Sequence, residues 1–406
     1  MARIVQKFGG TSIADIDRIR GAARRVHRAV DAGDRVAVVV SAMAGVTDDL
    51  AEKVRAAAPM HDAREYDTVL AAGEQITAGL LALALQDRGV AARSWLGWQI
   101  PVRTDDAHGS ARIAAIETAE IARRLDAGEV AVVAGFQGVG ADGRVTTLGR
   151  GGSDTSAVAL AAALAAERCE IFTDVDGVYT ADPRIVAQAR KLDKITYEEM
   201  LELASQGAKV LQTRSVALAM AHQVRIQVLS SFNDGPGTLV VDEDEIVEQQ
   251  IVSGIAYSRD DAKLTLVGVP DRPGVAAGIF GPLAAANVNV DMIVQNVSAD
   301  GTLTDLTFTV ARADLDRALA ILEGLRDDYG FETLVPDRAV VKVSVIGVGM
   351  RSHAGVANQM FRALAERGIN IQVISTSEIK ISVLIAEEYL ELAVRALHSA
   401  YGLDGV

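Results

Sequence analysis

Aromatic residues are scarce in this sequence, and their scarcity limits how a core can be built. Only 4% of the 406 residues are Phe, Trp or Tyr, although half of the residues are hydrophobic. The core must therefore consist mainly of Ala, Val, Leu and Ile, a composition typical of α/β proteins with buried parallel strands. The length allows two or three domains, each with its own core.

Cysteine is almost absent. A single cysteine, Cys169, excludes an intrachain disulfide and any metal site made of several cysteines. The six histidines are scattered and show no ligand spacing, so we expect no resident metal site. A reducing compartment, the cytoplasm, fits this cysteine usage.

Clustered positive charge and long apolar runs are also lacking. The chain has 40 basic and 54 acidic residues, a net charge of −14, and basic residues occur at most as isolated pairs. This balance argues against nucleic acid and anionic membranes as partners. The N-terminus reaches a strand without an apolar signal segment, and the longest uncharged alanine-rich run, residues 155–166, is too short to span a bilayer. We therefore expect a soluble protein.

The stretch 148–184 (LGRGGSDTSAVALAAALAAERCEIFTDVDGVYTADPR) contains the richest set of polar residues. A glycine pair at 151–152 lets the backbone approach a ligand closely, and Ser153 or Asp154 is the expected N-cap of the alanine-rich helix that follows. Helix starts of this kind bind anions. The next strand, residues 169–173, is followed by two carboxylates at 174 and 176, at the edge where open α/β sheets bind ligands.

A second candidate anion site lies near the N-terminus. Residues 3–8 are expected to form a strand, and the glycine pair Gly9 and Gly10 opens a turn before a helix over about 13–30. Lys7, two residues before the glycine pair, supplies a point charge suited to phosphate. An ordinary strand-to-helix turn with a surface lysine is the alternative.

The central part of the first half alternates buried strands with helices. Residues 35–41 form an apolar strand that places Ser41 and Thr47 at and just beyond its carboxyl end, and a second such strand lies within 128–138. A helix over 67–88 carries Glu74 in an apolar surround, either as a solvated surface acid or as a site residue. Alternation of this kind up to residue 240 predicts one doubly wound, mainly parallel α/β domain.

The second half contains an internal repeat. After an acidic linker at 242–250, residues 263–269 match residues 342–348, and residues 274–294 align with residues 355–375. Each copy reads strand, helix, strand, strand, helix, and the first closes with a further strand at 331–335. The second copy lacks that strand, so we expect the apolar segment 251–257 to supply it and to interlock the copies. The predicted domains are 1–241, 242–250 as linker, 263–338, and 251–262 with 339–406.

The loops after the first strand of each copy are candidate ligand sites. They read DRPG at 271–274 and MRSHAG at 350–355, and Asn289 and Asn370 occupy equivalent positions. A glycine helix start facing polar residues suits the carboxylate of a small zwitterion. The alternative is that these are only turn and cap residues.

Together these features favour phosphoryl transfer, which needs positioning and charge neutralisation more than a covalent nucleophile. The turn at 9–12 lacks the G-x-G-x-x-G spacing of dinucleotide-binding dehydrogenases, and a Walker-type P-loop is absent. No Ser-His-Asp order or activated cysteine stands out. The class that remains is a kinase whose nucleotide-binding fold is neither of these two.

Four motifs in order resemble aspartate kinase followed by its tandem ACT regulatory domains. They are KFGGTS at 7–12, GRGGSDTSA at 149–157, FTDVDGVYTADPR at 172–184 and GAKVL at 207–211, and the likeness covers essentially the whole chain. The resemblance implies an amino-acid-kinase fold followed by two βαββαβ ferredoxin-like ACT domains. It also implies transfer of the ATP γ-phosphoryl group to the side-chain carboxylate of L-aspartate, the first step of lysine, threonine and methionine biosynthesis.

The resemblance assigns roles residue by residue. Lys7, Gly9 and Gly10 would hold the transferring phosphoryl group, and Asp154 would orient Lys7. Arg150 would clamp the α-carboxylate of aspartate, and Glu74 would pair with its ammonium group. The substrate pocket would be completed by Ser41, Thr47 and Ser153. The nucleotide side would be lined by Ser12, Thr173, Asp174, Asp176, Tyr179, Arg184, Lys209 and Val210, with Mg²⁺ bound chiefly through the phosphates of ATP.

Two departures from the family pattern leave this assignment intact. Ser156 stands where many relatives have Thr, and Gln212-Thr213 replaces a more usual pair that contains His. Neither change removes a charge that the mechanism needs.

The resemblance also implies feedback inhibition through the ACT domains by lysine, threonine or both. The candidate threonine site comprises Asp271, Pro273, Gly274, Ala276, Asn289 and Gln295. The candidate lysine-linked site comprises His353, Gly355, Asn370, Thr376, Ser377 and Glu378. The arrangement implies a homo-oligomer, or a hetero-oligomer with a shorter regulatory subunit of the same C-terminal sequence. Unpaired ACT sheet edges also favour an oligomer.

Two other functions remain open at this point. One is another enzyme of the amino-acid-kinase fold that acts on acetylglutamate or glutamate, although such enzymes lack tandem ACT-like repeats. The other is a catalytically silent chain that only senses amino acids. The presence of Lys7, Arg150 and Asp154 argues against the second.

Overall fold

The computed structural model describes all residues except 1, 209, 247–249, 298–300 and 405–406. Its internal contacts divide the chain into two units. Unit 1 comprises Met1–Val178, Lys191–Ala204 and Lys209–Glu248, and unit 2 comprises Tyr179–Arg190, Ser205–Ala208 and Gln249–Val406.

Unit 1 is built on an eight-stranded sheet in the order β10-β12-β11-β9-β1-β2-β6-β3. Its strands are β1 (Arg3–Phe8), β2 (Arg35–Val40), β3 (Ala92–Trp95), β6 (Val130–Ala134), β9 (Arg168–Thr173), β10 (Lys194–Thr196), β11 (Ile226–Ser230) and β12 (Thr238–Val241). Only the β11–β12 pair is antiparallel. The central strands are nearly continuous runs of buried Val, Ala and Ile, which satisfies the expectation of a doubly wound, mainly parallel sheet.

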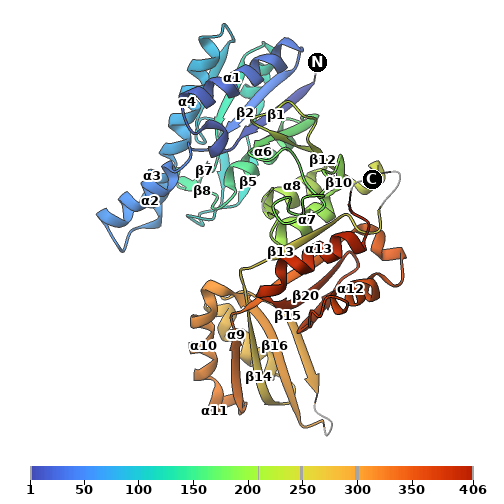
Figure 1. Cartoon of the computed structure of the whole chain (residues 1–406). Helices are drawn as coiled ribbons and strands as arrows, with labels where there is room; N and C mark the ends of the chain where they lie inside the picture. Colours follow the sequence, from blue (N-terminus) through green and yellow to red (C-terminus); the bar gives the residue numbers. More distant parts are fainter. Residues whose placement is uncertain (1, 209, 247–249, 298–300, 405–406) are drawn as a thin grey trace. The chain divides into compact units, whose positions relative to one another are not determined.

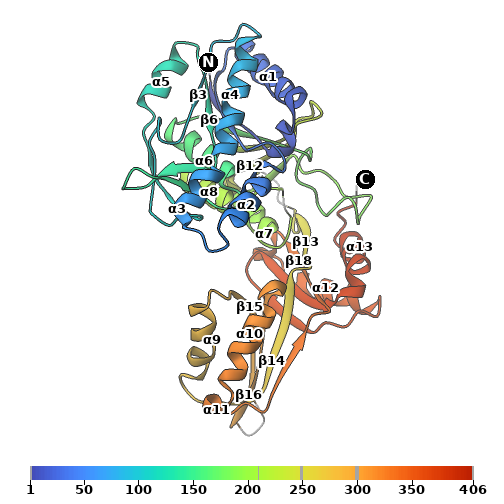
Figure 2. The same ribbon diagram turned by 90° about the vertical axis from the view of Figure 1, so that its left-hand side faces the viewer.

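Helices cover both faces of this sheet. They are α1 (Ile16–Asp31), α2 (Val46–Ala57), α3 (Ala63–Leu70), α4 (Ala72–Gln86), α5 (Ala119–Asp126), α6 (Gly152–Ala163), α7 (Tyr197–Ser205) and α8 (Thr213–His222). α1 and α4 lie side by side on one face, where Ile19 and Leu81 pack against Ile4, Phe8 and Val38 (Figures 1 and 2). Because side chains alternate along a strand, the odd-numbered residues of β1 and β2 face α6 on the other side. A small sheet β5-β4-β7-β8 completes unit 1, from Ile113–Ile116, Val102–Thr104, Gln137–Val139 and Val145–Thr147.

Some helix boundaries differ from the sequence-based expectation. The first helix begins at Ile16 rather than near residue 13, because Asp15 caps it by accepting a hydrogen bond from the Arg18 backbone N–H, and a short 3₁₀ turn (Gly10–Ile13) precedes it. The helix expected at 67–88 is two helices, α3 and α4, which meet at Ala71. Together they form the one described stretch, Ala63–Gln86, whose length and composition would allow a membrane crossing; half of its most apolar window is buried in the protein.

Unit 2 contains two four-stranded antiparallel sheets, each covered by helices on one face (Figure 2). The first comprises β14 (Asp261–Pro270), β15 (Val290–Val297), β16 (Leu303–Ala311) and β17 (Thr333–Asp337), with α9 (Val275–Ala285), α10 (Leu315–Gly324) and α11 (Arg326–Tyr329). The second comprises β13 (Gly254–Ser258), β18 (Val340–Ile346), β19 (Val373–Thr376) and β20 (Lys380–Ala386), with α12 (Val356–Ala365) and α13 (Leu390–Ala400). β13 pairs with β18, so the segment before the first repeat does supply the missing strand of the second.

Equivalent residues of the two repeats contact each other across unit 2. The Lys342 ammonium lies 2.8 Å from Asp291, and the Lys263 ammonium donates to the side-chain oxygen of Gln372 at 2.5 Å. Lys263 corresponds to Lys342, and Asp291 to Gln372, in the repeat alignment. Burial opposes charge on Lys342, yet Asp261 and Asp291 hold its pKa above the ordinary value. The repeats are therefore joined by a pseudo-symmetric pair of contacts as well as by the shared strand.

Candidate active site

A pocket of about 310 Å³ opens in unit 1 where β1 and β2 end and α6 begins. This is the carboxyl edge of the parallel strands, where such sheets bind ligands. The pocket is lined by Lys7, Gly10, Ser41, Ala42, Met43, Ala44, Gly45, Thr47, Asp48, Glu74, Phe136, Gly149, Gly151, Gly152, Ser153 and Asp154. Residues from five distant segments of the sequence thus share one cavity.

A buried ion pair forms the floor of the pocket. The Lys7 ammonium lies 2.5 Å from the Asp154 carboxylate, and both residues are buried. Lys7 is on β1 and Asp154 is in the first turn of α6, on the face of the sheet that α6 covers. The expected N-cap role of Ser153 or Asp154 is wrong: the cap is Gly151, in the left-handed conformation with φ 71°. Because glycine makes this turn, the Asp154 carboxylate is available to Lys7.

The glycine turn after β1 leaves room for a ligand next to Lys7. A Cβ added to Gly10 would lie only 3.0 Å from the Ala42 carbonyl oxygen, so a side chain there would crowd the neighbouring loop. The Gly9 N–H donates to the carbonyl of Phe172 on β9, which joins the turn to the adjacent strand. A bare backbone beside a lysine is suited to binding phosphate oxygens.

Glu74 is buried in the pocket wall with one oxygen unpaired. It is 3% exposed, Oε1 accepts the Ala42 N–H at 2.9 Å, and Oε2 has no hydrogen-bond partner among the described residues. Desolvation raises the pKa of Glu74 from 4.5 to about 7. The alternative of a solvated surface acid is therefore excluded, and a cationic group bound here would restore ionisation.

Replacing Glu74 by Gln should stabilise the ligand-free protein at alkaline pH. The folded-state pKa of Glu74 lies above the unfolded value, so its contribution to the unfolding free energy falls as pH rises from 4.5 to about 7. Gln stays neutral, so we expect the Glu74→Gln variant to exceed the parent by about 3 kcal/mol at pH 8 and to match it near pH 4.5. Denaturant unfolding at both pH values measures this difference. An equal gain at both would contradict the burial effect.

Arg150 lies beside the pocket rather than in its lining. Arg150 is exposed, and no hydrogen bond or ion pair to the described residues fixes its side chain. Its neighbours Gly149 and Gly151 do line the cavity. The guanidinium is thus free to turn toward a ligand. Ser41, Thr47 and Ser153, which the sequence assigned to the same pocket, do line it.

The residues expected at the nucleotide divide between the two units. Thr173, Asp174, Asp176 and Val210 belong to unit 1, Tyr179 and Arg184 belong to unit 2, and Lys209 lies outside the described residues. In unit 1, Asp176 lies 3.4 Å from the Lys191 ammonium. Ser12 accepts a hydrogen bond from the Ser231 hydroxyl at 2.5 Å, and Ser231 N–H donates to the Thr173 carbonyl. The end of β9 and the glycine turn are therefore linked through Ser231.

Sequence reasoning missed several residues of this region. Phe136 lines the pocket with φ 67°, an uncommon conformation for a bulky residue that often marks a functional site. Met43 and Asp48 also line the pocket, and Lys191 and Ser231 flank the end of β9. Phe136 lies within the stretch 128–138 where a buried strand was predicted, but no sequence pattern marked it or the other four as site residues.

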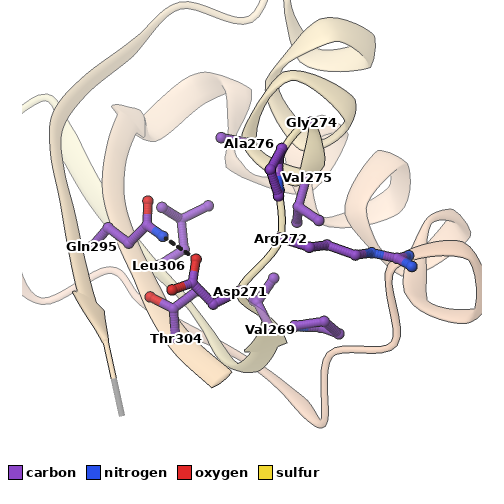
Figure 3. A pocket seen from close by; sticks show the side chains of 11 residues that line it. Val269, Asp271, Arg272, Gly274, Val275, Ala276, Gln295, Thr304 and Leu306 are labelled. Atoms are coloured by element: carbon purple, nitrogen blue, oxygen red, sulfur yellow. Dashed lines mark hydrogen bonds between the residues drawn. The ribbon is translucent and has the colours of Figure 1, made fainter. Parts of the chain in front are cut away.

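A second pocket, of about 510 Å³, lies in the first repeat of unit 2 (Figure 3). Its lining includes Asp271, Pro273, Gly274, Ala276 and Gln295, and the Gln295 amide donates to the Asp271 carboxylate at 3.4 Å. Val269, Thr304 and Leu306 complete one wall. Asn289, grouped with these residues from the sequence, does not line the pocket. It precedes β15, whereas Gln295 is the sixth of the eight residues of that strand.

The equivalent residues of the second repeat gather around two loops. Arg351 lies 3.7 Å from Glu378, which brings the loop before α12 to the turn between β19 and β20. His353 contacts the Gly349 carbonyl through Nδ1, and Gly355 caps α12 with φ 98°. Thr376 and Ser377 belong to the same end of β19, while Asn370 precedes its other end.

Sequence comparisons identify the family. Residues 2–230 match the amino acid kinase family, and residues 263–327 and 343–401 each match the ACT domain. The aspartate kinase of Stutzerimonas stutzeri is 58% identical over 405 residues, with 100% of this chain and 98% of that protein aligned. The chain belongs to the aspartate kinase family. The aspartokinases of Pseudomonas aeruginosa and Mycobacterium tuberculosis are 58% and 50% identical, also with 100% of this chain aligned and with 98% and 97% of theirs.

Solved structures agree with this assignment of an aspartate kinase. E. coli aspartokinase III in complex with aspartate and ADP aligns with a TM-score of 0.80 and 30% identity, covering 98% of this chain and 99% of that one. The same enzyme in complex with lysine and aspartate aligns with a TM-score of 0.76 and 29% identity, with 98% coverage of both chains. The predicted fold class and the enzyme class, an ATP-dependent kinase, are confirmed.

Proposed function

We infer that the pocket of unit 1 binds L-aspartate beside the γ-phosphoryl group of ATP and transfers that group to the side-chain carboxylate, giving 4-phospho-L-aspartate. The buried Lys7–Asp154 pair carries this inference, because it places a fixed positive charge beside a bare glycine turn. Such an arrangement neutralises charge on a phosphoryl group in transfer. The relative from E. coli was solved with aspartate and ADP, the ligands this site would hold.

The substrate would be held by groups of opposite charge. Glu74, with an unpaired buried oxygen, faces the ammonium group of aspartate, and Arg150 clamps the α-carboxylate. Ser41, Thr47 and Ser153 complete the pocket by hydrogen bonding. A bound ammonium would also lower the pKa of Glu74 and keep it ionised.

The chemistry needs no strong base. The aspartate side chain is already ionised at neutral pH, so it can attack phosphorus directly. Lys7 holds the transferring group together with the backbone of Gly9 and Gly10, and Asp154 keeps Lys7 aimed at it. Mg²⁺ bound to the phosphates of ATP would neutralise further charge.

We place the rest of the nucleotide along the end of β9 and the segments that follow. Ser12 is linked to the end of β9 through Ser231. This link supports a nucleotide that extends from its phosphates near Ser12 to its ribose near the end of β9. The proposed contacts are Thr173, Asp174, Asp176, Tyr179, Arg184, Lys209 and Val210. The proposed kinase domain extends over 1–241, although Tyr179–Arg190 and Ser205–Ala208 within it pack with unit 2, and the two ACT domains would follow the linker.

An ADP-release assay tests the proposed substrate. We expect release with aspartate, and little or none with glutamate or acetylglutamate at the same concentration. Faster release with either of the other two acids would assign the protein to a different kinase of this fold. No release with aspartate would indicate a silent regulatory chain.

We propose that threonine binds the pocket of the first repeat and that lysine acts through the equivalent loops of the second. The pocket offers a glycine helix start for the carboxylate and an acidic side chain, Asp271, for the ammonium. The lysine complex of the E. coli relative supports an amino-acid effector. Saturating aspartate or ATP should then weaken effector binding, because coupling between sites is reciprocal.

Replacing Gln295 by Ala should weaken inhibition by threonine at least tenfold in the concentration for half inhibition. The amide lines the pocket and hydrogen-bonds to Asp271, so its loss removes a polar contact and loosens the carboxylate. Activity without effector should not change. Gln359→Ala, on α12, removes a comparable amide outside the pocket and should leave inhibition intact. Identical threonine responses of the Gln295 variant and the parent would disprove the assignment.

Oligomerisation is part of the proposal. The strand β17 lies at an edge of its sheet and is mostly exposed, so a strand of another chain could pair with it, which favours a homo-oligomer or pairing with a shorter regulatory subunit. A cytoplasmic location fits the single buried cysteine, Cys169, and the need for ATP.

A further inference from the structure

A buried carboxylate lies behind the loop that carries Arg150. Asp67, on α3, is fully buried and outside the pocket lining. It accepts hydrogen bonds from Thr147 N–H at 2.9 Å, Thr147 Oγ1 at 2.5 Å, Gly109 N–H at 3.1 Å and His108 Nδ1 at 2.8 Å. A carboxylate removed from water is stabilised only if it is paired or hydrogen-bonded in this way. Its partners show what it holds.

These partners lead directly to Arg150. Thr147 ends β8, two residues before Gly149, and its carbonyl accepts the Ala111 N–H at 2.9 Å. Gly149 has φ 75° and packs against the 108–109 turn, so that an added Cβ would lie 2.9 Å from the Gly109 carbonyl oxygen. Asp67 therefore fixes both the strand end and the turn on which the Arg150 loop rests.

Arg214 completes the support from the other side. Its guanidinium donates to the Leu148 carbonyl at 2.8 Å and to the Ala111 carbonyl at 2.7 Å. By contrast, no such contact fixes the Arg150 side chain among the described residues. Asp67 and Arg214 therefore hold the backbone from which the Arg150 side chain starts, while the guanidinium itself stays free to turn toward a ligand.

We propose that Asp67 is a positioning residue for the aspartate substrate, acting through Arg150. It holds the backbone before the arginine so that the guanidinium meets the α-carboxylate without ordering the loop at each binding event. This inference rests on the proposed role of Arg150.

Both side-chain oxygens of residue 67 must accept hydrogen bonds in this network. The N–H groups of Thr147 and Gly109 can only donate. In an Asp67→Asn variant, the new amide N–H₂ would face at least one of these donors, and the variant has the same size as the parent. The loop would shift while the buried volume stayed the same.

The test is steady-state kinetics of Asp67→Asn. We expect the KM for aspartate to rise at least tenfold, with the KM for ATP within twofold of the parent. The matched control is Asp15→Asn, because exposed Asp15 also accepts a backbone N–H, that of Arg18, but lies outside the 105–112 turn, and the KM values of this variant should not change. In the Arg150→Ala variant, a further Asp67→Asn change should raise the KM for aspartate by less than twofold, because the arginine that Asp67 positions is absent.

A second pair of variants decides the question if Asp67→Asn does not fold. Thr147→Val removes one donor to Asp67, and Thr147→Ser keeps it. The Val variant should show at least a fivefold higher KM for aspartate than the Ser variant, again with similar KM values for ATP. Equal KM values for aspartate in this pair, parallel rises for both substrates, or full additivity with Arg150→Ala would overturn the positioning role. If Arg150→Ala itself leaves the KM for aspartate unchanged, the proposed substrate clamp fails first.

Discussion

Replacement of Lys7 by Met is expected to lower kcat for ADP formation by about 1,000-fold, the order found when one charge-stabilising group is removed from a transfer site. Met keeps most of the length of the side chain but has no charge, so the transferring phosphoryl group loses its fixed cation. The variant also leaves Asp154 buried without its partner at 2.5 Å. The unpaired Asp154 carboxylate would repel the phosphates of ATP and lower kcat further.

Two further variants make this expectation specific. Lys53→Met removes an exposed lysine that pairs with Asp49 one helical turn away, and kcat should stay within twofold of the parent. Asp154→Asn keeps Lys7 but frees it, and should lower kcat less than Lys7→Met does. Initial rates at saturating aspartate and ATP give these values. If Lys7→Met retained more than a tenth of the parent kcat, Lys7 would not stabilise the transfer step.

Replacement of Arg150 by Ala should raise the KM for aspartate about 100-fold, which corresponds to about 2.7 kcal/mol. A guanidinium binds a carboxylate through two parallel hydrogen bonds, and loss of such a pair removes both charge and geometry. The KM for ATP should change by less than threefold, because Arg150 is proposed to contact only the amino acid. Initial rates with one substrate varied at a time measure the two effects.

The control for this variant is another exposed arginine of unit 1. Arg103 on β4 forms an ion pair with Glu117 on the surface, and Arg103→Ala should leave both KM values unchanged. Lysine at position 150 keeps the charge but lacks the planar fork, so Arg150→Lys should recover only part of the affinity. Equal rises in both KM values for Arg150→Ala would remove the residue from the substrate pocket.

Much of the architecture could be predicted because strong local patterns agree with the tertiary structure. Buried runs such as 35–40 and 130–134 indicate parallel strands, and the repeat reveals two similar sheets. Counting strands was enough to assign the β13 segment to the second sheet. Details that depend on one turn were missed: the cap of α6 is Gly151 because the backbone there is left-handed, which a preference for Ser or Asp does not reveal.

The site could be predicted where a motif carries the chemistry and not where distant contacts create it. Lys7 and Asp154 are 147 positions apart in sequence, but each belongs to a recognisable glycine-rich motif. Phe136 and Asp67 carry no such signal. Their importance comes from a left-handed backbone in one case and from four donors of other segments in the other. Only three-dimensional structure brings those groups together.

The segment Tyr179–Arg190 belongs to unit 2, and this has a consequence for synthesis on the ribosome. Thr180 hydrogen-bonds to buried His398 at a separation of 218 residues, and the Ile185 carbonyl accepts from Arg395, 210 residues later. At about 5–20 residues per second, the segment waits roughly 10–40 s after its own translation before these partners exist. Ala181, Ile185 and Val186, which enter the core beside Leu397, remain exposed for that time. The nascent chain therefore carries an unpacked apolar segment, within and just beyond the motif at 172–184, until the residues near 398 are made.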